Sequence, residues 1–264
     1  PEPGLNFNQR ALEVMKMHIE VSKATAHPDD DLLVWPENAI DVDPFSNVEA
    51  KRLLDEFFTE VKVPLISGAV IERSGLKNVT IKFDGSKRSI YEKRYLTPFG
   101  EFIPLRPLAE LVSPYTDMVR DFTPGDSLKT HRVSGIDIAS VICYEILNDG
   151  IFRESADKSK LILVHTNSAT FFGTAEGEQQ LAITRIRAIE HQRSIVSVST
   201  TGPSAIINAR GEVTQKLAEG ERGSLSQQIA LSDFETISDR LGGWAPMLVI
   251  FASLLLSIAQ RRRS

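Results

Sequence analysis

Short apolar runs alternate with segments of helical periodicity along most of the chain. Apolar residues at helical spacing predict helices over 7–26, 48–61 and 179–193. Runs rich in β-branched residues predict strands over 32–35, 64–72, 136–146, 161–165, 195–199 and 205–208. Because strands and helices alternate, the pattern predicts a layered α/β domain.

A hairpin and a long arm occupy the middle of the chain. Asp84–Gly85 is a turn signal between two predicted antiparallel strands over 77–83 and 89–95, and the second strand carries Lys93. The segment 99–118 follows, and its prolines exclude a regular helix throughout. This segment contains many apolar residues for one that should lie on the surface, so it either packs against the core or has a role that requires apolar surface.

The C-terminal segment differs in kind from the rest. No charged residue occurs from Leu241 to Ala259, and the chain then ends in three arginines and a serine. This pattern predicts a membrane-spanning helix, with Trp244 at one interface and the arginines on the cytoplasmic side. The alternative is a buried C-terminal helix, which would normally show a polar face.

The expected organisation is therefore a main domain over 1–238, a transmembrane helix over 239–260 and a cytoplasmic basic tail over 261–264. The start at Pro1, without an initiator Met or a signal peptide, is typical of a piece of a longer protein.

Composition narrows the classes of function. At 264 residues with 42% hydrophobic and 25% charged residues, the chain can bury one large core. A net charge of -5 and a pI near 5.6 argue against nucleic acid as a partner. The single cysteine cannot form an internal disulfide, and no Cys/His cluster has metal-ligand spacing, so no metal is expected.

Two candidate reactive groups follow predicted strands. Cys143 lies at the carboxyl end of the strand over 136–146, where loops of an α/β sheet converge, and Glu145 follows two positions later. Glu37 comes directly after the strand over 32–35, beside Trp35 and Pro36, which favours a raised pKa and a general base. The alternatives are a buried structural cysteine and an exposed turn glutamate.

Three motifs occur in an order that resembles a known family. Glu37 in VWPENA, Lys93 in YEKRYLTPFGE and Cys143 in VICYEI resemble the catalytic triad of the nitrilase (carbon–nitrogen hydrolase) superfamily. Together with RIRAIEHQRS and the apolar C-terminal segment, these three motifs resemble the sequence of the apolipoprotein N-acyltransferase family of the bacterial envelope. The resemblance implies a nitrilase-like four-layer αββα sandwich, followed here by the transmembrane helix.

The resemblance also implies residue roles. Cys143 would be the nucleophile, Glu37 the general base, and Lys93 the positive charge that lowers the thiol pKa and stabilises the oxyanion. Glu101, Tyr144 and Glu145 would support them. The loop TNSATFFG departs from the form common in the family, so no role is carried over to Ser168 or Thr170.

The implied reaction is a two-step acyl transfer without metal or nucleotide cofactor. Cys143 would take an acyl chain from a membrane phospholipid as a thioester. The α-amine of the lipid-modified N-terminal cysteine of an apolipoprotein, the diacylglyceryl-modified acceptor, would then attack the thioester. The protein would belong to the bacterial inner membrane, with its catalytic domain on the extracytoplasmic side.

Other functions remain open from the sequence. One is a membrane-tethered amidase or nitrilase, which would hydrolyse its thioester with water. Another is a non-catalytic binding or assembly module that kept the fold. For the arm over 99–118, the alternative to core packing is a lid that faces the bilayer and covers the thioester.

Overall fold

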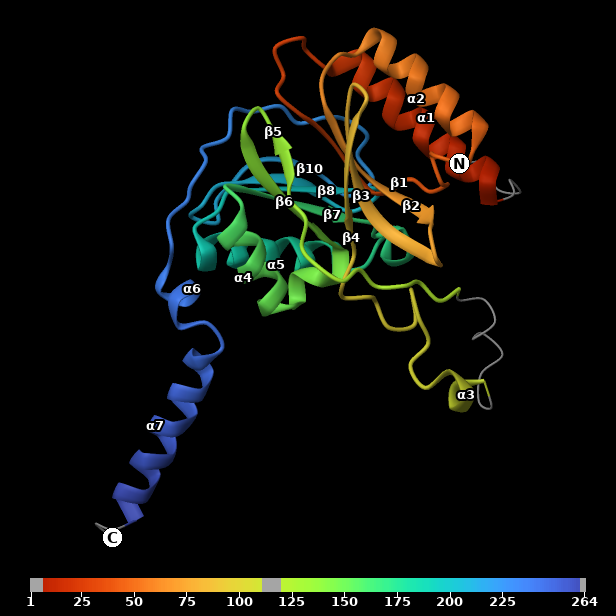
Figure 1. Ribbon diagram of the computed structural model, residues 1–264. Coiled ribbons are helices and arrows are strands. Elements are labelled where there is room, and N and C mark those ends of the chain that lie inside the picture. The colour runs from red at the N-terminus through yellow and green to blue at the C-terminus, as the bar shows by residue number, and fades with distance from the viewer. Residues whose placement is uncertain (1–6, 111–119, 262–264) are drawn as a thin grey trace.

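Figure 1 shows the computed structural model, in which residues 7–110 and 120–261 are described. The helices are α1 (Phe7–Thr25), α2 (Val48–Glu60), α3 (Arg106–Ala109), α4 (Asp149–Lys158), α5 (Glu176–His191), α6 (Ile237–Leu241) and α7 (Trp244–Arg261). Two 3₁₀ helices are η2 (Cys143–Leu147) and η3 (Ala169–Phe171). The strands are β1 (Leu33–Ile40), β2 (Leu65–Glu72), β3 (Leu76–Asp84), β4 (Lys87–Glu92), β5 (His131–Val133), β6 (Ile136–Ile142), β7 (Leu161–Thr166), β8 (Ile195–Ser199), β9 (Ser204–Ile207) and β10 (Val213–Leu217).

The strands form two mixed sheets that pack face to face. The first has four strands in the order β1-β2-β3-β4, and the second has six in the order β10-β9-β8-β7-β6-β5. Parallel pairs join β1 to β2 and β6 to β7 to β8, and the other neighbours are antiparallel. The α/β expectation is therefore confirmed.

Helices cover the outer face of each sheet, which gives four layers (Figure 1). Trp35 and Phe57 belong to the apolar cluster that joins α1 and α2 to the first sheet. Phe152 belongs to the cluster that joins α4 and α5 to the second sheet. Between the sheets, Ile66 of β2 packs with Ile138 and Leu163 of the second sheet. Each layer thus buries apolar side chains toward its neighbour, as the alternating sequence pattern requires.

The strands that lead to the candidate residues end elsewhere than the sequence indicates. The strand predicted over 32–35 continues through Pro36 to Ile40, because β1 is an edge strand where a proline removes no ladder hydrogen bond. The strand predicted over 89–95 ends at Glu92, and the strand predicted over 136–146 ends at Ile142. Lys93 and Cys143 therefore both lie just beyond a strand.

The C-terminal expectation needs correction. The residues after 236 form two helices, because the backbone of Gly242, with φ 55° and ψ -141°, ends α6. The second helix, α7, has 18 residues and is therefore about 27 Å long. Within 7–110 and 120–261, no helix combines the length and the apolar character needed to cross a membrane. The predicted transmembrane helix over 239–260 is thus not found among these residues, and 262–264 of the basic tail lie outside the described residues.

The alternative of a buried C-terminal helix is also wrong. Helix α7 extends away from the layered body (Figure 1). Apolar side chains along it are exposed, among them Trp244, which is 71% exposed, and Phe251, which is 63% exposed. The helix therefore presents apolar surface to its surroundings.

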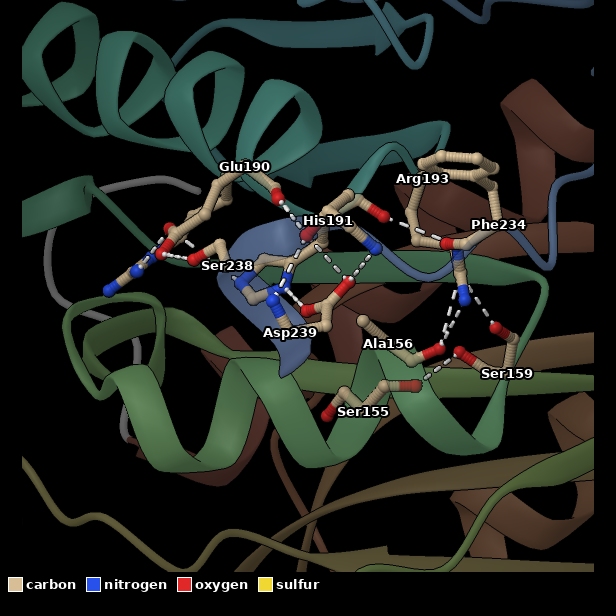
Figure 2. A network of polar contacts seen from close by, with 11 residues as sticks. Ser155, Ala156, Ser159, Glu190, His191, Arg193, Phe234, Ser238 and Asp239 are labelled. Atoms are coloured by element: carbon tan, nitrogen blue, oxygen red, sulfur yellow. Dashed lines mark hydrogen bonds and ion pairs between the residues drawn. The ribbon is translucent and has the colours of Figure 1, made fainter. Parts of the chain in front are cut away.

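The segment before α7 is fixed to the body by polar contacts (Figure 2). The His191 ring contacts the Asp239 carboxylate at the end of α5, and Ser238 Oγ donates to Glu190 Oε1 at 3.1 Å. Arg193, which is 4% exposed, donates to the carbonyl oxygens of Ala156 and Phe234 at 2.8 and 2.6 Å. The start of α7 is thereby positioned by the end of α5.

A cavity of about 1100 Å³ lies beside the edge strand β1. Its walls are α1, the inner face of the second sheet and the extended segment 217–231. Glu37, Lys93 and Cys143 do not line it. The cavity is therefore separate from the candidate reactive groups.

Glu37 lies at an irregular turn of β1 that depends on a glycine in β2. The pairing of β1 with β2 shifts register between Trp35 and Ile40, and Asn38 has φ 56°. A Cβ on Gly68 would lie 2.5 Å from Glu37 Cα and 2.5 Å from the Pro36 carbonyl oxygen. Only glycine at position 68 lets the two backbones approach this closely.

We expect Gly68→Ala to displace Glu37 and to lower the free energy of unfolding by about 1–3 kcal/mol, because the added methyl group meets rigid backbone. Urea unfolding monitored by circular dichroism measures this loss. Gly243→Ala is the matched control, since its Cβ would meet nothing within 4 Å. Equal stability of the two variants would contradict the packing argument.

Two buried histidines link the sheets. Thr80 and Ser89 flank the two ring nitrogens of His131 at 2.9 and 2.7 Å, and His165 Nδ1 lies 2.8 Å from the Trp35 carbonyl oxygen. Burial lowers the pKa of His131 to about 3 and the pKa of His165 to about 4. Both rings are therefore neutral in the folded protein at neutral pH.

Stability should fall as the pH falls from about 6.5 toward about 4. Over this range the unfolded chain, with histidine pKa values of about 6.5, binds protons that the folded chain does not. The urea midpoint measured at intervals from pH 7.5 to 4.5 reports this loss, and His165→Gln should flatten the profile. A wild-type profile that is level over this range would refute the assignment of neutral buried rings.

Candidate active site

The three residues of the predicted triad come from different elements and meet at one place. Glu37 lies within β1, Lys93 directly after β4, and Cys143 at the first position of η2. Lys93 Nζ lies 3.4 Å from Glu37 Oε1, and both groups act electrostatically on the Cys143 thiol. The structure thus brings together the residues that the motifs singled out.

Lys93 is the centre of a buried charge cluster. Its side chain is 1% exposed, and Nζ lies 2.7 Å from Glu101 Oε2 as well as near Glu37. Thr97 Oγ1 accepts a further hydrogen bond from Nζ at 3.3 Å. Although burial by itself would lower it, the two carboxylates raise the pKa of Lys93, so the amine stays charged.

Asn78 of β3 completes this cluster and was not foreseen from the sequence. Its Nδ2 donates to Glu37 Oε1 at 2.8 Å and to Glu101 Oε1 at 2.7 Å. The Asn78 side chain is buried, and its Oδ1 has no hydrogen-bond partner among the described residues. One amide and one ammonium therefore hold the two carboxylates in place.

Glu37 and Glu101 are also fixed through the backbone. Thr200 Oγ1 donates to the Glu37 carbonyl oxygen at 2.8 Å, which connects β1 to the second sheet. The Thr97 backbone N–H donates to Glu101 Oε2 at 2.7 Å. The expected supporting position of Glu101 thus corresponds to direct contact with Lys93.

Cys143 occupies a backbone conformation that is unusual for a residue with a side chain. Its φ is 49°, in the left-handed region, at the point where β6 passes into η2. Such a turn presents the side chain at the carboxyl edge of the sheet. Cys143 is half-buried and packs beside Tyr91 and Ile142.

The electrostatics of the thiol differ from the sequence expectation. Burial and the charge of Glu37 raise the pKa of Cys143 above its usual range, while Lys93 and a hydrogen bond from Gln180 lower it. The predicted effect of Lys93 therefore has the expected sign, but the net pKa of Cys143 is raised, because burial and the charge of Glu37 outweigh Lys93 and Gln180. The resting thiol is protonated at neutral pH.

Glu145 joins the segment around Lys93 to the turn at Cys143. Its Oε1 accepts from Tyr91 Oη at 2.8 Å and from the Arg94 backbone N–H at 2.7 Å, and its Oε2 accepts from the Ile142 backbone N–H at 2.8 Å. Burial raises the pKa of Glu145, opposed by these hydrogen bonds. Glu145 is fully buried, so its place is structural support beneath the site.

Tyr144 lies apart from the charge cluster. Its ring stacks on Tyr95, with ring centroids 5.3 Å apart and an interplanar angle of 9°. Both tyrosines immediately neighbour site segments, since Tyr95 follows Lys93 by two positions and Tyr144 follows Cys143. The pair thus connects the residue after Cys143 to the segment after Lys93.

The arrangement provides the parts needed for nucleophilic acyl chemistry. A carboxylate lies beside the thiol to accept its proton, and a fixed ammonium lies nearby to stabilise negative charge on an attacked carbonyl oxygen. Among the described residues, no group of His, Cys, Asp and Glu side chains is suited to hold a metal ion.

Known proteins resemble the chain in sequence over most of its length. The family model for carbon-nitrogen hydrolase matches residues 5–238. Proteins named apolipoprotein N-acyltransferase are similar: that of Mycolicibacterium smegmatis is 29% identical over 100% of this chain and 48% of its own length. Those of Shewanella oneidensis and Aquifex aeolicus are 30% and 32% identical, over 87% and 78% of this chain and 48% and 47% of their own lengths. The chain thus spans about half the length of these relatives.

Solved structures share the fold. An amidase of the nitrilase superfamily from Nesterenkonia matches with a TM-score of 0.61 and 14% identity, covering 81% of this chain and 82% of that one. A CN-hydrolase superfamily protein from Xanthomonas campestris matches with a TM-score of 0.62 and 15% identity, covering 80% and 82%. The likeness of the two layered sheets and the match over residues 5–238 agree, and the chain belongs to the carbon-nitrogen hydrolase family.

Proposed function

We propose that the chain is the catalytic part of an apolipoprotein N-acyltransferase. The observation that carries this proposal is the meeting of Glu37, Lys93 and Cys143 in one site of a chain that resembles relatives of that name over 78–100% of its own length. The acyl donor would be a membrane phospholipid, and the acceptor would be the diacylglyceryl-modified cysteine of an apolipoprotein.

In the first step the Cys143 sulfur attacks the ester carbonyl of the donor. Glu37 takes the thiol proton as the new S–C bond forms, and this proton passes to the leaving alkoxide as the ester C–O bond breaks. The products are a thioester on Cys143 and a lysophospholipid. Lys93 stabilises the oxyanion, and one well-placed donor of this kind contributes about 3 kcal/mol.

In the second step the free α-amine of the acceptor attacks the thioester. The N–C bond forms and the C–S bond breaks, while Glu37 takes a proton from the attacking amine and passes it to the departing sulfur, which restores the thiol and the Glu37 carboxylate. The sum is an ester and an amine converted to an amide and an alcohol. The energy of the thioester suffices, so the scheme involves no metal or nucleotide.

We place the reaction at the extracytoplasmic face of a bacterial cell membrane, with residues 1–238 as the catalytic domain. The exposed apolar side chains of α7 support contact with a bilayer. The arm after Lys93 extends from the body in the same general direction as α7 (Figure 1). Contact of both segments with one lipid surface is part of this proposal.

We expect Cys143→Ala to abolish acyl transfer without loss of the fold, because the half-buried side chain forms little of the core. Cys143→Ser should be nearly inactive, since a serine hydroxyl ionises far less readily than a thiol. The assay combines phospholipid vesicles with a diacylated lipopeptide and identifies the products by mass spectrometry.

The same assay separates the proposal from a hydrolase of the same family. A hydrolase would release free fatty acid from the donor and leave the lipopeptide amine unmodified. Transfer retained by Cys143→Ala would refute the assignment of the nucleophile.

The arm presents apolar side chains outward while one residue anchors it. Phe99 and Leu105 are 67% and 75% exposed, at φ values of 63° and 50°. Ile103 is buried, and its backbone N–H donates to Asp121 Oδ1 at 3.2 Å. Residues 111–118 of the predicted arm lie outside the described residues. These contacts support the interpretation that the exposed part is a lid that meets lipid and covers the thioester.

The double variant Phe99→Ser with Leu105→Ser should lower transfer from vesicle phospholipid several-fold, since it removes apolar surface that docks on the bilayer. Its melting temperature and the iodoacetamide labelling of Cys143 should stay close to wild type. Ile103→Ser is the control for core packing and should lower the melting temperature. A similar loss of stability in the double variant would mean that the arm belongs to the core.

A further inference from the structure

Gln180 is the polar side chain of α5 that reaches the nucleophile. Its Nε2 lies 3.7 Å from Cys143 Sγ, within hydrogen-bond distance for sulfur. Gln180 is half-buried, whereas the preceding Gln179 is exposed. Neither residue was assigned a role from the sequence, where they are two adjacent glutamines near the start of a helix.

Helix α5 is held firmly against the nucleophile turn, so the Gln180 amide is not a free surface group. Arg187 lies two helical turns further along the same face and is buried. Its Nε donates to the Ile146 carbonyl oxygen of η2 at 2.9 Å, and its guanidinium contacts the Asp149 carboxylate. Two side chains of one helix thus contact the turn at Cys143 and at Ile146.

The charged groups around the Cys143 sulfur favour an uncharged hydrogen-bond donor beside it. The groups that act on the thiol are the Glu37 carboxylate and the Lys93 ammonium from the first sheet, and the Gln180 amide from α5. Lys93 is shared between two carboxylates, at 2.7 Å to Glu101 and 3.4 Å to Glu37. A thiolate would therefore lie beside a like charge, and a donor that carries no charge of its own can stabilise it without attracting a further carboxylate.

We propose that Gln180 donates a hydrogen bond to the Cys143 sulfur and stabilises the negative charge on it. This charge appears when the thiol is deprotonated for attack, and again when the acceptor amine expels the sulfur from the thioester. Gln180 would thus assist both steps through the same atom. The role rests on the proposed function only in requiring that Cys143 is the nucleophile.

The test is the pH dependence of Cys143 alkylation by iodoacetamide in the 264-residue protein, where this is the only cysteine. Gln180→Met keeps the length of the side chain and removes the donor. Its apparent thiol pKa should rise by about one pH unit, which is tenfold less thiolate at a given pH. Gln179→Met is the matched control and should follow the wild-type profile.

A structural role would not produce this result, because the melting temperature of Gln180→Met should equal that of wild type while the alkylation profile moves. If Gln180→Met folds poorly, Gln180→Glu provides the second variant, since its carboxylate adds a like charge and should raise the thiol pKa further. An alkylation profile of Gln180→Met or Gln180→Glu that superimposes on wild type overturns the proposal.

Transfer assays separate this inference from the proposed function. If the wild type transfers acyl chains, Gln180→Met should do so about tenfold more slowly at pH 7 and recover toward wild type at higher pH. If the wild type transfers nothing but the alkylation profile moves, the proposed function fails and the hydrogen bond stands. If transfer and alkylation by Gln180→Met both match wild type, the inference alone fails.

Discussion

The burial of the Lys93 ammonium is the constraint on which the site depends. An unpaired charge at 1% exposure would cost several kcal/mol, so its partners must be present and correctly placed. Glu37 and Glu101 supply them from β1 and from the segment after β4, and Asn78 links the two carboxylates. The cluster carries one more negative than positive charge. Burial, reinforced by the charge of Glu37, raises the pKa of the neighbouring Cys143 thiol, which is therefore protonated at rest.

A second set of contacts connects this charge cluster to Cys143. Lys93 directly follows a strand of the first sheet, and Cys143 directly follows a strand of the second. The two sheets pack through apolar contacts, which by themselves do not orient these two residues toward each other. Glu145 supplies the missing connection, because one carboxylate accepts from backbone N–H groups of both segments. The segment after Lys93 and the turn at Cys143 are therefore held as one unit, although fifty positions separate them.

The sequence predicted the layered fold and the three central residues because each signal was local. Glu37, Lys93 and Cys143 stand in short motifs near strand ends, and apolar periodicity located the large helices. Asn78, Gln180 and Arg187 were missed because their roles arise from packing between elements. Asn78 is one polar residue in a strand, and only the position and register of β3 between β2 and β4 give it two carboxylates. The predicted strand ends were wrong for a related reason. Pro36 is tolerated within β1 only because that strand lies at the edge of its sheet.

Helix α5 relates the chemistry to the C-terminal helix. Its first half places Gln180 at the sulfur, its middle places Arg187 on η2, and its end binds the segment that leads into α7 through His191 and Asp239. The same helix therefore contacts both Cys143 and the segment that precedes α7. If α7 meets a lipid surface as proposed, then α5 is the element that connects Cys143 to the segment next to that surface.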